Sequence, residues 1–268
     1  MGAAIHPGAV VASGAKLGEG VVVGPYACID DEVEIGDGTR IDAFATIRRH
    51  TRLGRNNHVF SYAMVGEEPQ DLKFHGEVSR LEIGDNNKIR EFATLHRGTE
   101  GGGGLTRVGD GCLLMAYTHV AHDCILGSHI VMSNNATLAG HVEVQDYAII
   151  GGLSAVHQFC RIGRCAFVGG MSGIGMDVPP YMLAAGSRAS LHGANLVGLR
   201  RLALPKENIA AIRAAFRLIW LSGTPRKDAL EEAALTYAAV PQVLEIVDFV
   251  KNSGSRNVLS ADREQAEA

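Results

Sequence analysis

Aliphatic residues recur at every sixth position through most of this chain. One series runs in steps of six from Ile5 to Val65, a second covers positions 83, 89 and 95, and a third runs from Val108 to Ile174. A period of six fits neither an amphipathic helix nor a strand that alternates strictly between two faces. It fits short parallel strands joined by tight corners. One apolar side chain per hexad then points inward, and stacked coils bury a continuous aliphatic column.

Glycine follows the same repeat. The chain has 33 glycines among 268 residues, without the every-third-residue spacing of collagen. Twelve of the repeat positions are followed directly by glycine, whereas random placement would give only about three. Tight corners need glycine or other small residues. The pattern resembles that of left-handed parallel β-helix proteins, in which three hexads form one triangular coil. The left hand comes from this resemblance, because spacing alone does not determine it.

Two interruptions and one end point divide the chain. The hexads pause at 66–82 and at 96–107, and we expect both segments to extrude as loops. The solenoid should stop near 177–181, where Pro179 and Pro180 lack the N–H that continues a strand ladder. Apolar residues follow helical spacing from Pro205, and further helices are expected at about 226–238 and 241–252. The predicted architecture is mainly β: a left-handed parallel β-helix over 1–190 and a C-terminal α-helical domain over 191–268. The polar tail after Asn252 should be frayed.

Stacking of successive coils should gather histidines at one edge. Residues 18 apart lie one above the other, with about 4.8 Å between them. This places His122 below Gly140 and Asp123 below His141. The edge contains His119, His122, His141, His157 and Gln158. A single histidine is usually a polar rung of a scaffold, but four at one edge favour a functional site.

Metal binding is one possible use of this edge. Zinc needs three protein ligands and an open position, which three histidines could provide. In the γ-class carbonic anhydrases, hexapeptide-repeat proteins that bind zinc, the two histidines of one coil are normally separated by four residues. His119 and His122 are separated by two. Cys124 and Cys160 could add ligands, but small buried thiols explain them equally well.

Acid/base chemistry is the other possible use. A neutral imidazole can take a proton from a hydroxyl while that oxygen attacks a carbonyl. A carboxylate can fix the imidazole tautomer, and a bare backbone amide can stabilise the oxyanion. His122, Asp123 and Gly140 offer these three groups, although neighbours on a strand point to opposite faces, so the first two can pair only at a corner. No Ser or Cys is clearly placed as a nucleophile, which favours direct transfer.

Charge, hydropathy and cysteine content argue against several classes of protein. The net charge of −4 gives no overall basic character of the kind that binds nucleic acid. No apolar run approaches the length of a membrane span, and the N-terminus does not show the pattern of a secretory signal. The five cysteines form no CxxC pair, and reduced thiols are the simplest interpretation. We therefore expect a cytoplasmic protein without stable membrane insertion.

Longer segments resemble one family of hexapeptide-repeat transferases. They are I-G-D-N-N-K-I-R-E-F-A-T-L-H-R-G-T at 83–99, H-V-A-H-D-C at 119–124, N-N-A-T-L-A-G-H-V at 134–142, A-I-I-G-G-L-S-A-V-H-Q-F at 148–159 and D-V-P-P-Y at 177–181. In this order, and with a helical C-terminus, they are similar to the acyl-carrier-protein-dependent UDP-N-acetylglucosamine O-acyltransferases, which open lipid A biosynthesis. The resemblance covers nearly the whole chain.

The resemblance implies roles for individual residues. His122 would deprotonate the sugar 3-hydroxyl, which attacks a 3-hydroxyacyl thioester. Asp123 would orient His122, and the Gly140 N–H would stabilise the oxyanion. A glycine at position 170 would leave room for a longer acyl chain. The positions that match substrate contacts are Gln70, Asp71, Lys73, His119, His141, His157, Gln158, Gly170, Asn195 and Arg201. The chain departs from the family pattern at Val197 and Leu202, where the family has an acidic and a basic residue.

The resemblance also implies partners: 3-hydroxyacyl carrier protein, UDP-N-acetylglucosamine, and two further copies of the chain in a homotrimer with active sites between subunits. No cofactor, catalytic metal or nucleic acid is implied. The carrier protein is acidic, so a basic surface would suit its docking. That surface would be formed by Arg161, Arg164, Arg188, Arg200 and Arg201.

Three alternatives stay open. One is the related N-acyltransferase that acts later in the pathway, which usually carries an extra N-terminal domain for which hexads starting at Ile5 leave no room. The others are a zinc enzyme and a catalytically silent scaffold. The sequence does not decide the length of the acyl chain, nor whether the acceptor is the 3-hydroxy sugar or its 3-amino analogue.

Overall fold

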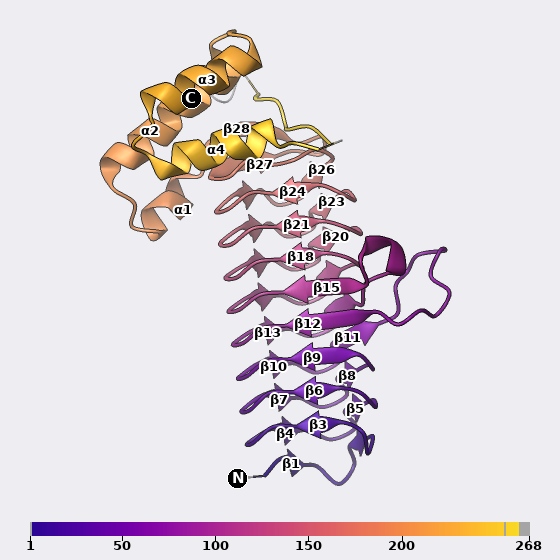
Figure 1. Ribbon diagram of the computed structural model, residues 1–268. Helices are drawn as coiled ribbons and strands as arrows, with labels where there is room; N and C mark the ends of the chain where they lie inside the picture. Colours follow the sequence, from indigo (N-terminus) through magenta and orange to yellow (C-terminus); the bar gives the residue numbers. More distant parts are fainter. Residues whose placement is uncertain (1, 255, 263–268) are drawn as a thin grey trace.

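The computed structural model describes residues 2–254 and 256–262 of the 268-residue chain. Most of it is a column of stacked coils that begins at the N-terminus and carries helices at its far end (Figure 1). Each coil contributes short strands to three sheets, and the strands of a sheet pair in parallel except in the final hairpin. The prediction of a parallel β-helix with a C-terminal helical region is confirmed.

The three sheets run along the whole column. The first has 11 strands, in the order β1 (Ala4–Ile5), β4 (Val22–Val23), β7 (Arg40–Ile41), β10 (His58–Val59), β13 (Lys88–Ile89), β16 (Leu113–Leu114), β19 (Val131–Met132), β22 (Ile149–Ile150), β25 (Phe167–Val168), β27 (Met182–Ala185) and β28 (Ser190–Ala194). The second has nine, β2 (Val10–Val11), β5 (Cys28–Ile29), β8 (Thr46–Ile47), β11 (Met64–Glu67), β14 (Thr94–His96), β17 (His119–Val120), β20 (Thr137–Leu138), β23 (Ala155–Val156) and β26 (Gly173–Ile174). The third has eight, β3 (Lys16–Leu17), β6 (Glu34–Ile35), β9 (Thr51–Leu53), β12 (Arg80–Ile83), β15 (Leu105–Val108), β18 (Ile125–Leu126), β21 (Glu143–Val144) and β24 (Arg161–Ile162).

The repeat residues form the core of this column. Val120 pairs with Leu138, and Leu138 pairs with Val156, so residues 18 apart are stacked as expected. Every repeat residue from Val23 to Ile174 is buried. Ile5 is 46% exposed because no coil covers the N-terminal end of the column. Full burial of one such side chain stabilises the fold by about 1.5–3 kcal/mol, so the stability of the column comes from stacking of successive coils.

Corners of the coils use an uncommon backbone conformation. Residues with positive φ occur at regular intervals, and many are not glycine, including Asp123 (φ 60) and His141 (φ 61). Non-glycine residues pay a steric cost in this region, which stacking of corner side chains offsets in part. On one corner the rings of successive coils stack at 4.8–5.1 Å between centroids, namely Tyr26, Phe44, Tyr62, Phe92 and Tyr117.

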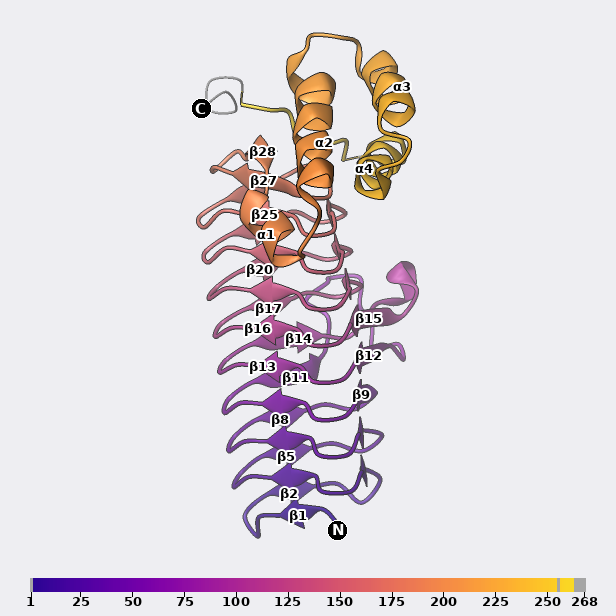
Figure 2. The same ribbon diagram turned by 90° about the vertical axis from the view of Figure 1, so that its left-hand side faces the viewer.

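The two interruptions of the repeat leave the column as neighbouring loops. The first loop occupies 68–79, between β11 and β12, and the second occupies 97–104, between β14 and β15. Both project from the side of the column at about mid-height (Figures 1 and 2). The second loop contains one 3₁₀ turn, η1 (Glu100–Gly102). Both loops are shorter than the expected segments, because residues at their ends continue the strands.

In the part of the chain that the structure describes, four helices and a π-helical turn lie beside and beyond the last coils, away from the N-terminus (Figure 2). They are α1 (Leu196–Arg201), α2 (Lys206–Phe216), η2 (Arg217–Leu221), α3 (Arg226–Thr236) and α4 (Pro241–Lys251). Arg161 of β24 binds Asp177 at 2.7 Å and stacks on the ring of Phe249 in α4, 4.2 Å from its centroid. Tyr181 donates a hydrogen bond to Glu245 of α4. These contacts attach the helices to the last coils.

The structure differs from the sequence prediction at two places near this end of the chain. The domain boundary expected at 190 falls inside β28, which is hydrogen-bonded to β27 in the first sheet, so the sheet continues to Ala194. The tail expected to fray is ordered over 256–262, where Val258 bridges Asp177 and the buried Leu259 accepts a hydrogen bond from Trp220 Nε1 at 3.0 Å. Because the tail is mostly polar, its sequence did not predict that Leu259 would be buried against the rest of the protein. Positions 255 and 263–268, which the same prediction covered, lie outside the described residues.

Helix length and polarity bear on membrane insertion. No helix in the described part of the chain is long and apolar enough to cross a membrane.

Candidate active site

A histidine and an aspartate meet at the corner that follows β17. The His122 Nδ1 atom lies 2.7 Å from Asp123 Oδ2. Neighbouring residues of a strand point to opposite faces, but the positive φ of Asp123 turns its carboxylate back toward His122. This hydrogen bond places the imidazole proton on Nδ1 and leaves the lone pair of Nε2 available. The pair is therefore arranged as a general base with a fixed tautomer.

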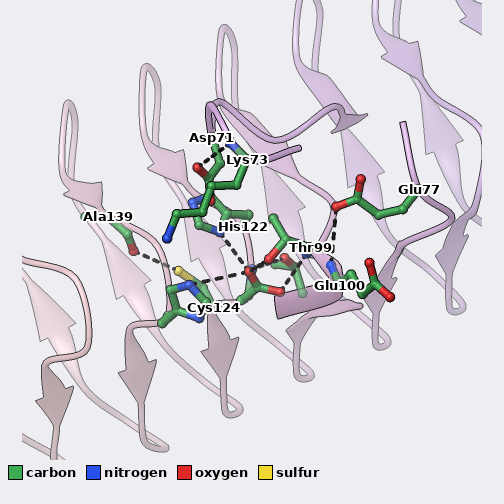
Figure 3. A network of polar contacts seen from close by, with 11 residues as sticks. Asp71, Lys73, Glu77, Thr99, Glu100, His122, Cys124 and Ala139 are labelled. Carbon is green, nitrogen blue, oxygen red and sulfur yellow. Dashed lines mark hydrogen bonds and ion pairs between the residues drawn. The ribbon is translucent and has the colours of Figure 1, made fainter. Parts of the chain in front are cut away.

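The Asp123 carboxylate is buried and held on both oxygens. Its side chain is only 1% exposed. Thr99, in the second loop, donates from its backbone N–H to Oδ1 at 2.8 Å and from its hydroxyl to Oδ2 at 2.7 Å. The Asp123 N–H donates to Thr106 Oγ1 at 2.7 Å. The network around Thr99 and His122 is drawn in Figure 3. Neither Thr99 nor Thr106 could be singled out from the sequence, because neither belongs to the stacked edge.

In the next coil, Gly140 has no side chain to cover its backbone, and it lies next to the imidazole of His122. The imidazole of His122 packs directly against Gly140, where a Cβ would lie 2.7 Å from Nε2. The Gly140 N–H donates to no acceptor among residues 2–254 and 256–262, and the same is true of His122 and Gln158, which occupy the equivalent corner positions. The stacking predicted from the sequence thus brings a free amide next to the atom that would accept a proton.

Two further histidines of the predicted edge border the pair. The ring of His141 meets that of His122 edge-on, 5.1 Å between centroids, and its Nε2 lies 3.7 Å from Asp123 Oδ2. The His119 Nδ1 atom lies 2.7 Å from Thr94 Oγ1. Burial lowers the pKa of His119 and of His141 below the ordinary 6.5, although Asp123 acts to raise that of His141. Both imidazoles are therefore neutral near pH 7.

A fifth histidine, His96, lies beneath this edge and was not expected there. It is 4% exposed, and its ring meets the ring of His119 edge-on, 4.9 Å between centroids. Burial, followed by the nearby His119 and His122, lowers the pKa of His96 to about 4. Its Nδ1 has no hydrogen-bond partner within the described chain. The only sequence signal was its place directly after the repeat residue Leu95, where the chain leaves the column.

The lowered pKa of His96 predicts a loss of stability in acid. An unfolded histidine titrates near pH 6.5, so between pH 6.5 and about 4 the unfolded chain binds more protons than the folded chain. The free energy of unfolding should therefore fall as the pH falls through this window. A shift of this size corresponds to about 3 kcal/mol for His96. Urea denaturation across the window should show a weaker pH dependence for His96→Gln than for wild type. The exposed His6→Gln should follow wild type, and equal pH dependence in all three proteins would contradict the assignment.

The remaining residues of the predicted edge lie apart from the pair. His157 and Gln158 are exposed, and His157 Nδ1 faces the backbone carbonyl of Gln158 at 3.2 Å. His157 lines an apolar cavity of about 540 Å³ over the second sheet. The lining residues of this apolar cavity are Thr137, Ala139, Ala155, Val156, His157, Gly173, Ile174, Gly175, Met176, Ser187, Arg188, Ala189 and Leu259. Ala139 directly precedes Gly140, so the cavity begins next to the base.

A second cavity, of about 640 Å³ and with a polar lining, lies between the two loops and the stacked edge. It is lined by Asp71, Lys73, His75, Gly76, Glu77, Thr99, Glu100, Gly101, His141 and Phe159. Figure 3 shows Asp71 and Lys73 of the first loop on the side of the column that carries His122. The charges of both loop residues act on the pKa of His141. Gln70, the third loop residue expected at the site, is exposed.

Three other predicted contacts are far from the pair in the fold. Gly170 is exposed at the corner before β26, and the atom nearest to a Cβ built there would be Gly152 O, at 3.4 Å. Asn195 is buried as the N-cap of α1, where its amide oxygen accepts from Gly198 N at 3.0 Å and its amide nitrogen donates to Cys165 O at 2.9 Å. Arg201 is exposed on α1. Because both ends of the Asn195 amide are used inside the protein, Asn195 is left out of the contacts proposed below.

The pair and His141 also form the one candidate metal site within the described residues. One ligand atom from each of His122, Asp123 and His141 lies within 4.8 Å of the others. However, Asp123 Oδ2 already accepts hydrogen bonds from His122 Nδ1 and Thr99 Oγ1. A metal ion would have to compete with both donors, so the donor set suits a hydrogen-bonded pair better. Elemental analysis tests this interpretation, and one equivalent of zinc bound through these histidines would overturn it.

The fold and the site together define a hexapeptide-repeat transferase with a histidine–aspartate pair. A family model described as bacterial transferase hexapeptide (six repeats) matches residues 105–140, and one described as Udp N-acetylglucosamine O-acyltransferase, domain 2, matches 177–259. An acyl-[acyl-carrier-protein]--UDP-N-acetylglucosamine O-acyltransferase from Sulfurovum sp. (strain NBC37-1) is 47% identical over 93% of this chain and 95% of its own length.

Solved structures of similar proteins support the same family. The UDP-N-acetylglucosamine acyltransferase from Bacteroides fragilis 9343 superposes with a TM-score of 0.93 at 41% identity, over 95% of this chain and 99% of its own. The enzyme from Francisella novicida gives 0.92 at 36% identity over 98% of both chains. The chain belongs to the acyl-[acyl-carrier-protein]--UDP-N-acetylglucosamine O-acyltransferase family, and the resemblance drawn from the sequence is confirmed.

Proposed function

We propose that this enzyme transfers a 3-hydroxyacyl chain from the thioester of acyl carrier protein to the 3-hydroxyl of UDP-N-acetylglucosamine, the first step of lipid A biosynthesis. Family membership supports the acyl donor and the sugar nucleotide. The observation that carries the chemistry is the free Nε2 of His122, whose tautomer is held by Asp123 and which lies against the bare amide of Gly140.

Each group then has one role in the transfer. The His122 Nε2 takes the proton of the sugar 3-hydroxyl as that oxygen attacks the thioester carbonyl. The Gly140 N–H stabilises the negative oxygen of the tetrahedral intermediate, and the buried Asp123 carboxylate stabilises the protonated imidazole. The intermediate collapses when the C–S bond breaks, and the departing thiolate of the carrier protein receives the proton from His122.

Direct transfer is supported by the state of the nearby thiols. Cys124 follows the pair, but it is buried and its thiol donates to Ala139 O at 3.2 Å. Burial raises the pKa of Cys124 to about 12 and that of Cys160 to about 11. Because the thiolate is the reactive form of cysteine, neither residue is suited to form an acyl-enzyme. The hydroxyl of the sugar is then the nucleophile.

The two cavities suit the two substrates. The polar cavity offers Lys73 to the negatively charged diphosphate, and Asp71 and the neutral His141 to sugar hydroxyls. We propose that the exposed Gln70, on the same loop, also contacts the sugar nucleotide. The apolar cavity, which His157 lines, suits the acyl chain. We propose that the exposed Gln158, the next residue, also contacts it. We propose that His119 contacts the substrate next to His122, and that Arg201 contacts the nucleotide or the carrier protein.

The exposed corner at Gly170 predicts the acyl-chain preference. Gly170 lies just before β26, whose residues line the apolar cavity, and a Cβ built there would make ordinary van der Waals contact with Gly152 O at 3.4 Å. Replacement by a long side chain, Gly170→Met, should shorten the chain that fits. We expect kcat/KM for the longest 3-hydroxyacyl carrier protein accepted by wild type to fall about tenfold or more. The shortest chain should react as before. An unchanged preference across the series would show that Gly170 does not limit chain length.

We further propose a homotrimer that works in the cytoplasm and docks the carrier protein through basic residues. All five cysteines are unpaired, which fits a reducing compartment. Arg164, Arg188, Arg200 and Arg201 are candidates for docking the acidic partner. Arg161 is less suited, because it already pairs with Asp177 and Phe249. Sedimentation equilibrium would measure the number of subunits.

The proposal is tested by identifying the product. Purified enzyme is mixed with UDP-N-acetylglucosamine or its 3-amino analogue and with 3-hydroxyacyl carrier proteins of several lengths, and the products are measured by mass spectrometry. We expect an ester on the 3-hydroxy sugar and dependence on the carrier protein. Transfer only to the amino sugar would identify an N-acyltransferase, and no product with either acceptor would refute acyl transfer.

A further inference from the structure

We propose that the second loop positions the catalytic pair, with Thr99 as the residue that fixes the Asp123 carboxylate and Gly102 as the residue that leaves space for it. This inference rests on the proposed function, because it assigns a purpose to the loop only if His122 acts as a base. It concerns two residues that lie 24 and 21 positions before Asp123 in the sequence and that would act through its carboxylate.

Thr99 holds both oxygens of the carboxylate. Its N–H donates to Oδ1 at 2.8 Å, and its hydroxyl donates to Oδ2 at 2.7 Å. The same Oδ2 accepts the His122 Nδ1 proton at 2.7 Å. A carboxylate bound at one oxygen can rotate about its Cβ–Cγ bond, but one bound at both oxygens cannot do so without losing a hydrogen bond. Thr99 therefore fixes the angle at which Asp123 meets the imidazole.

Gly102 supplies the space that this arrangement needs. A Cβ built on Gly102 would overlap the Asp123 carboxylate itself, including both of its oxygens. The backbone of Gly102 has no positive φ, so lack of space, and not backbone strain, is what requires glycine here. Its neighbour Gly101 has nothing within 4 Å of a built Cβ. Gly254, which is exposed, lines neither cavity and has no positive φ, likewise has nothing within 4 Å of a built Cβ, so it serves as the control for Gly102.

Hydrogen bonds within the second loop and to β12 hold Thr99 in place. The Thr99 carbonyl accepts hydrogen bonds from Gly104 N at 2.7 Å and from Gly102 N at 3.0 Å. The Gly104 carbonyl in turn accepts from Arg80 N of β12 at 2.8 Å. This chain of bonds ties the threonine to the column. The outer side of the loop, including Glu100 and Gly101, lines the polar cavity. One loop thus borders the proposed sugar-nucleotide pocket and holds the carboxylate of the pair.

Two substitutions of Thr99 separate positioning from packing. Thr99→Val keeps the volume and the methyl group but removes the hydroxyl, and Thr99→Ser keeps the hydroxyl but removes the methyl group. If Thr99 positions Asp123, Thr99→Val should lower kcat by about 10- to 100-fold with little change in KM for the sugar nucleotide. Thr99→Ser should retain most of the activity. A packing role predicts the reverse order, with Thr99→Ser the more damaged, and that outcome would overturn the proposal.

Substitution of Gly102 provides an independent test, with Gly254 as the control. Gly102→Ala should lower kcat by at least about tenfold, because the new methyl group displaces the carboxylate from His122. Gly254→Ala, on an exposed residue outside both cavities, should leave kcat unchanged. Equal activity of both alanine variants would contradict the role of Gly102. Circular dichroism establishes whether each variant folds, and if Gly102→Ala does not fold, the two threonine variants decide the matter.

The same assays distinguish failure of this inference from failure of the proposed function. If wild type makes no acylated sugar, the function itself is wrong. If wild type is active and His122→Ala is not, while Thr99→Val and Gly102→Ala turn over at the wild-type rate, the function stands and the positioning role is refuted.

Discussion

Replacing His122 by alanine should lower kcat at least about a hundredfold, the usual scale for loss of a general base. The expected effect is large because no other group near the pair is ready to take its place. Asp123 is buried with both oxygens engaged, and the neutral His141 lies edge-on to the His122 ring. Steady-state rates with saturating substrates would measure the loss. Binding of the sugar nucleotide should change little, because the proposed pocket is lined by other residues.

A matched control for this substitution is His129→Ala. His129 is another corner histidine of the same column, exposed and stacked on the Tyr147 ring at 4.9 Å. It lies outside both cavities, so kcat should be that of wild type. Thermal unfolding of both variants should show that the folded state persists. Near-normal turnover in a folded His122→Ala enzyme would contradict the assignment of His122 as the base.

The second large effect is expected for Gly140→Ala. A Cβ at this position would lie 2.7 Å from His122 Nε2, well inside ordinary van der Waals contact. The imidazole would have to turn away from Asp123 or from the substrate, and displacement of a catalytic group by about 1 Å can cost about a hundredfold in rate. The substitution keeps the backbone N–H and does not meet a positive φ, so the column should still fold.

Assays of Gly140→Ala should therefore show a reduced kcat with a normal unfolding temperature. Gly254→Ala, which adds a methyl group in open space on an exposed residue outside both cavities, is the control and should match wild type. An active Gly140→Ala enzyme would mean that His122 does not work in the position seen here. It would also mean that the packing of His122 against Gly140 has no part in catalysis.

The sequence predicted the column because its repeat is local and uniform. One aliphatic residue per hexad is enough to specify which side chain points inward, and every repeat residue from Val23 to Ile174 is buried. The repeat also fixed the stacking of His122 under Gly140, since residues 18 apart pair along the column. Sites formed by stacked coils can therefore be predicted from spacing alone.

Features that depend on the path of a loop or on a single backbone angle could not be predicted in the same way. The His122–Asp123 pair requires a positive φ at Asp123, which aspartate tolerates better than most residues but which the sequence does not guarantee. Thr99 meets Asp123 only because the second loop folds back onto the column. The tail was expected to fray because the buried Leu259 stands in a mostly polar segment.

The central claim is that His122 activates the sugar hydroxyl for direct attack on the thioester. Its most direct test is a single-turnover reaction in which the masses of enzyme and product are measured together. Enzyme mixed with 3-hydroxyacyl carrier protein should keep its unmodified mass, and addition of UDP-N-acetylglucosamine should yield the 3-O-acyl product in wild type but at least about a hundredfold more slowly in His122→Ala. An enzyme that gains the mass of the acyl group before the sugar is added, and passes it on afterwards, would contradict the account.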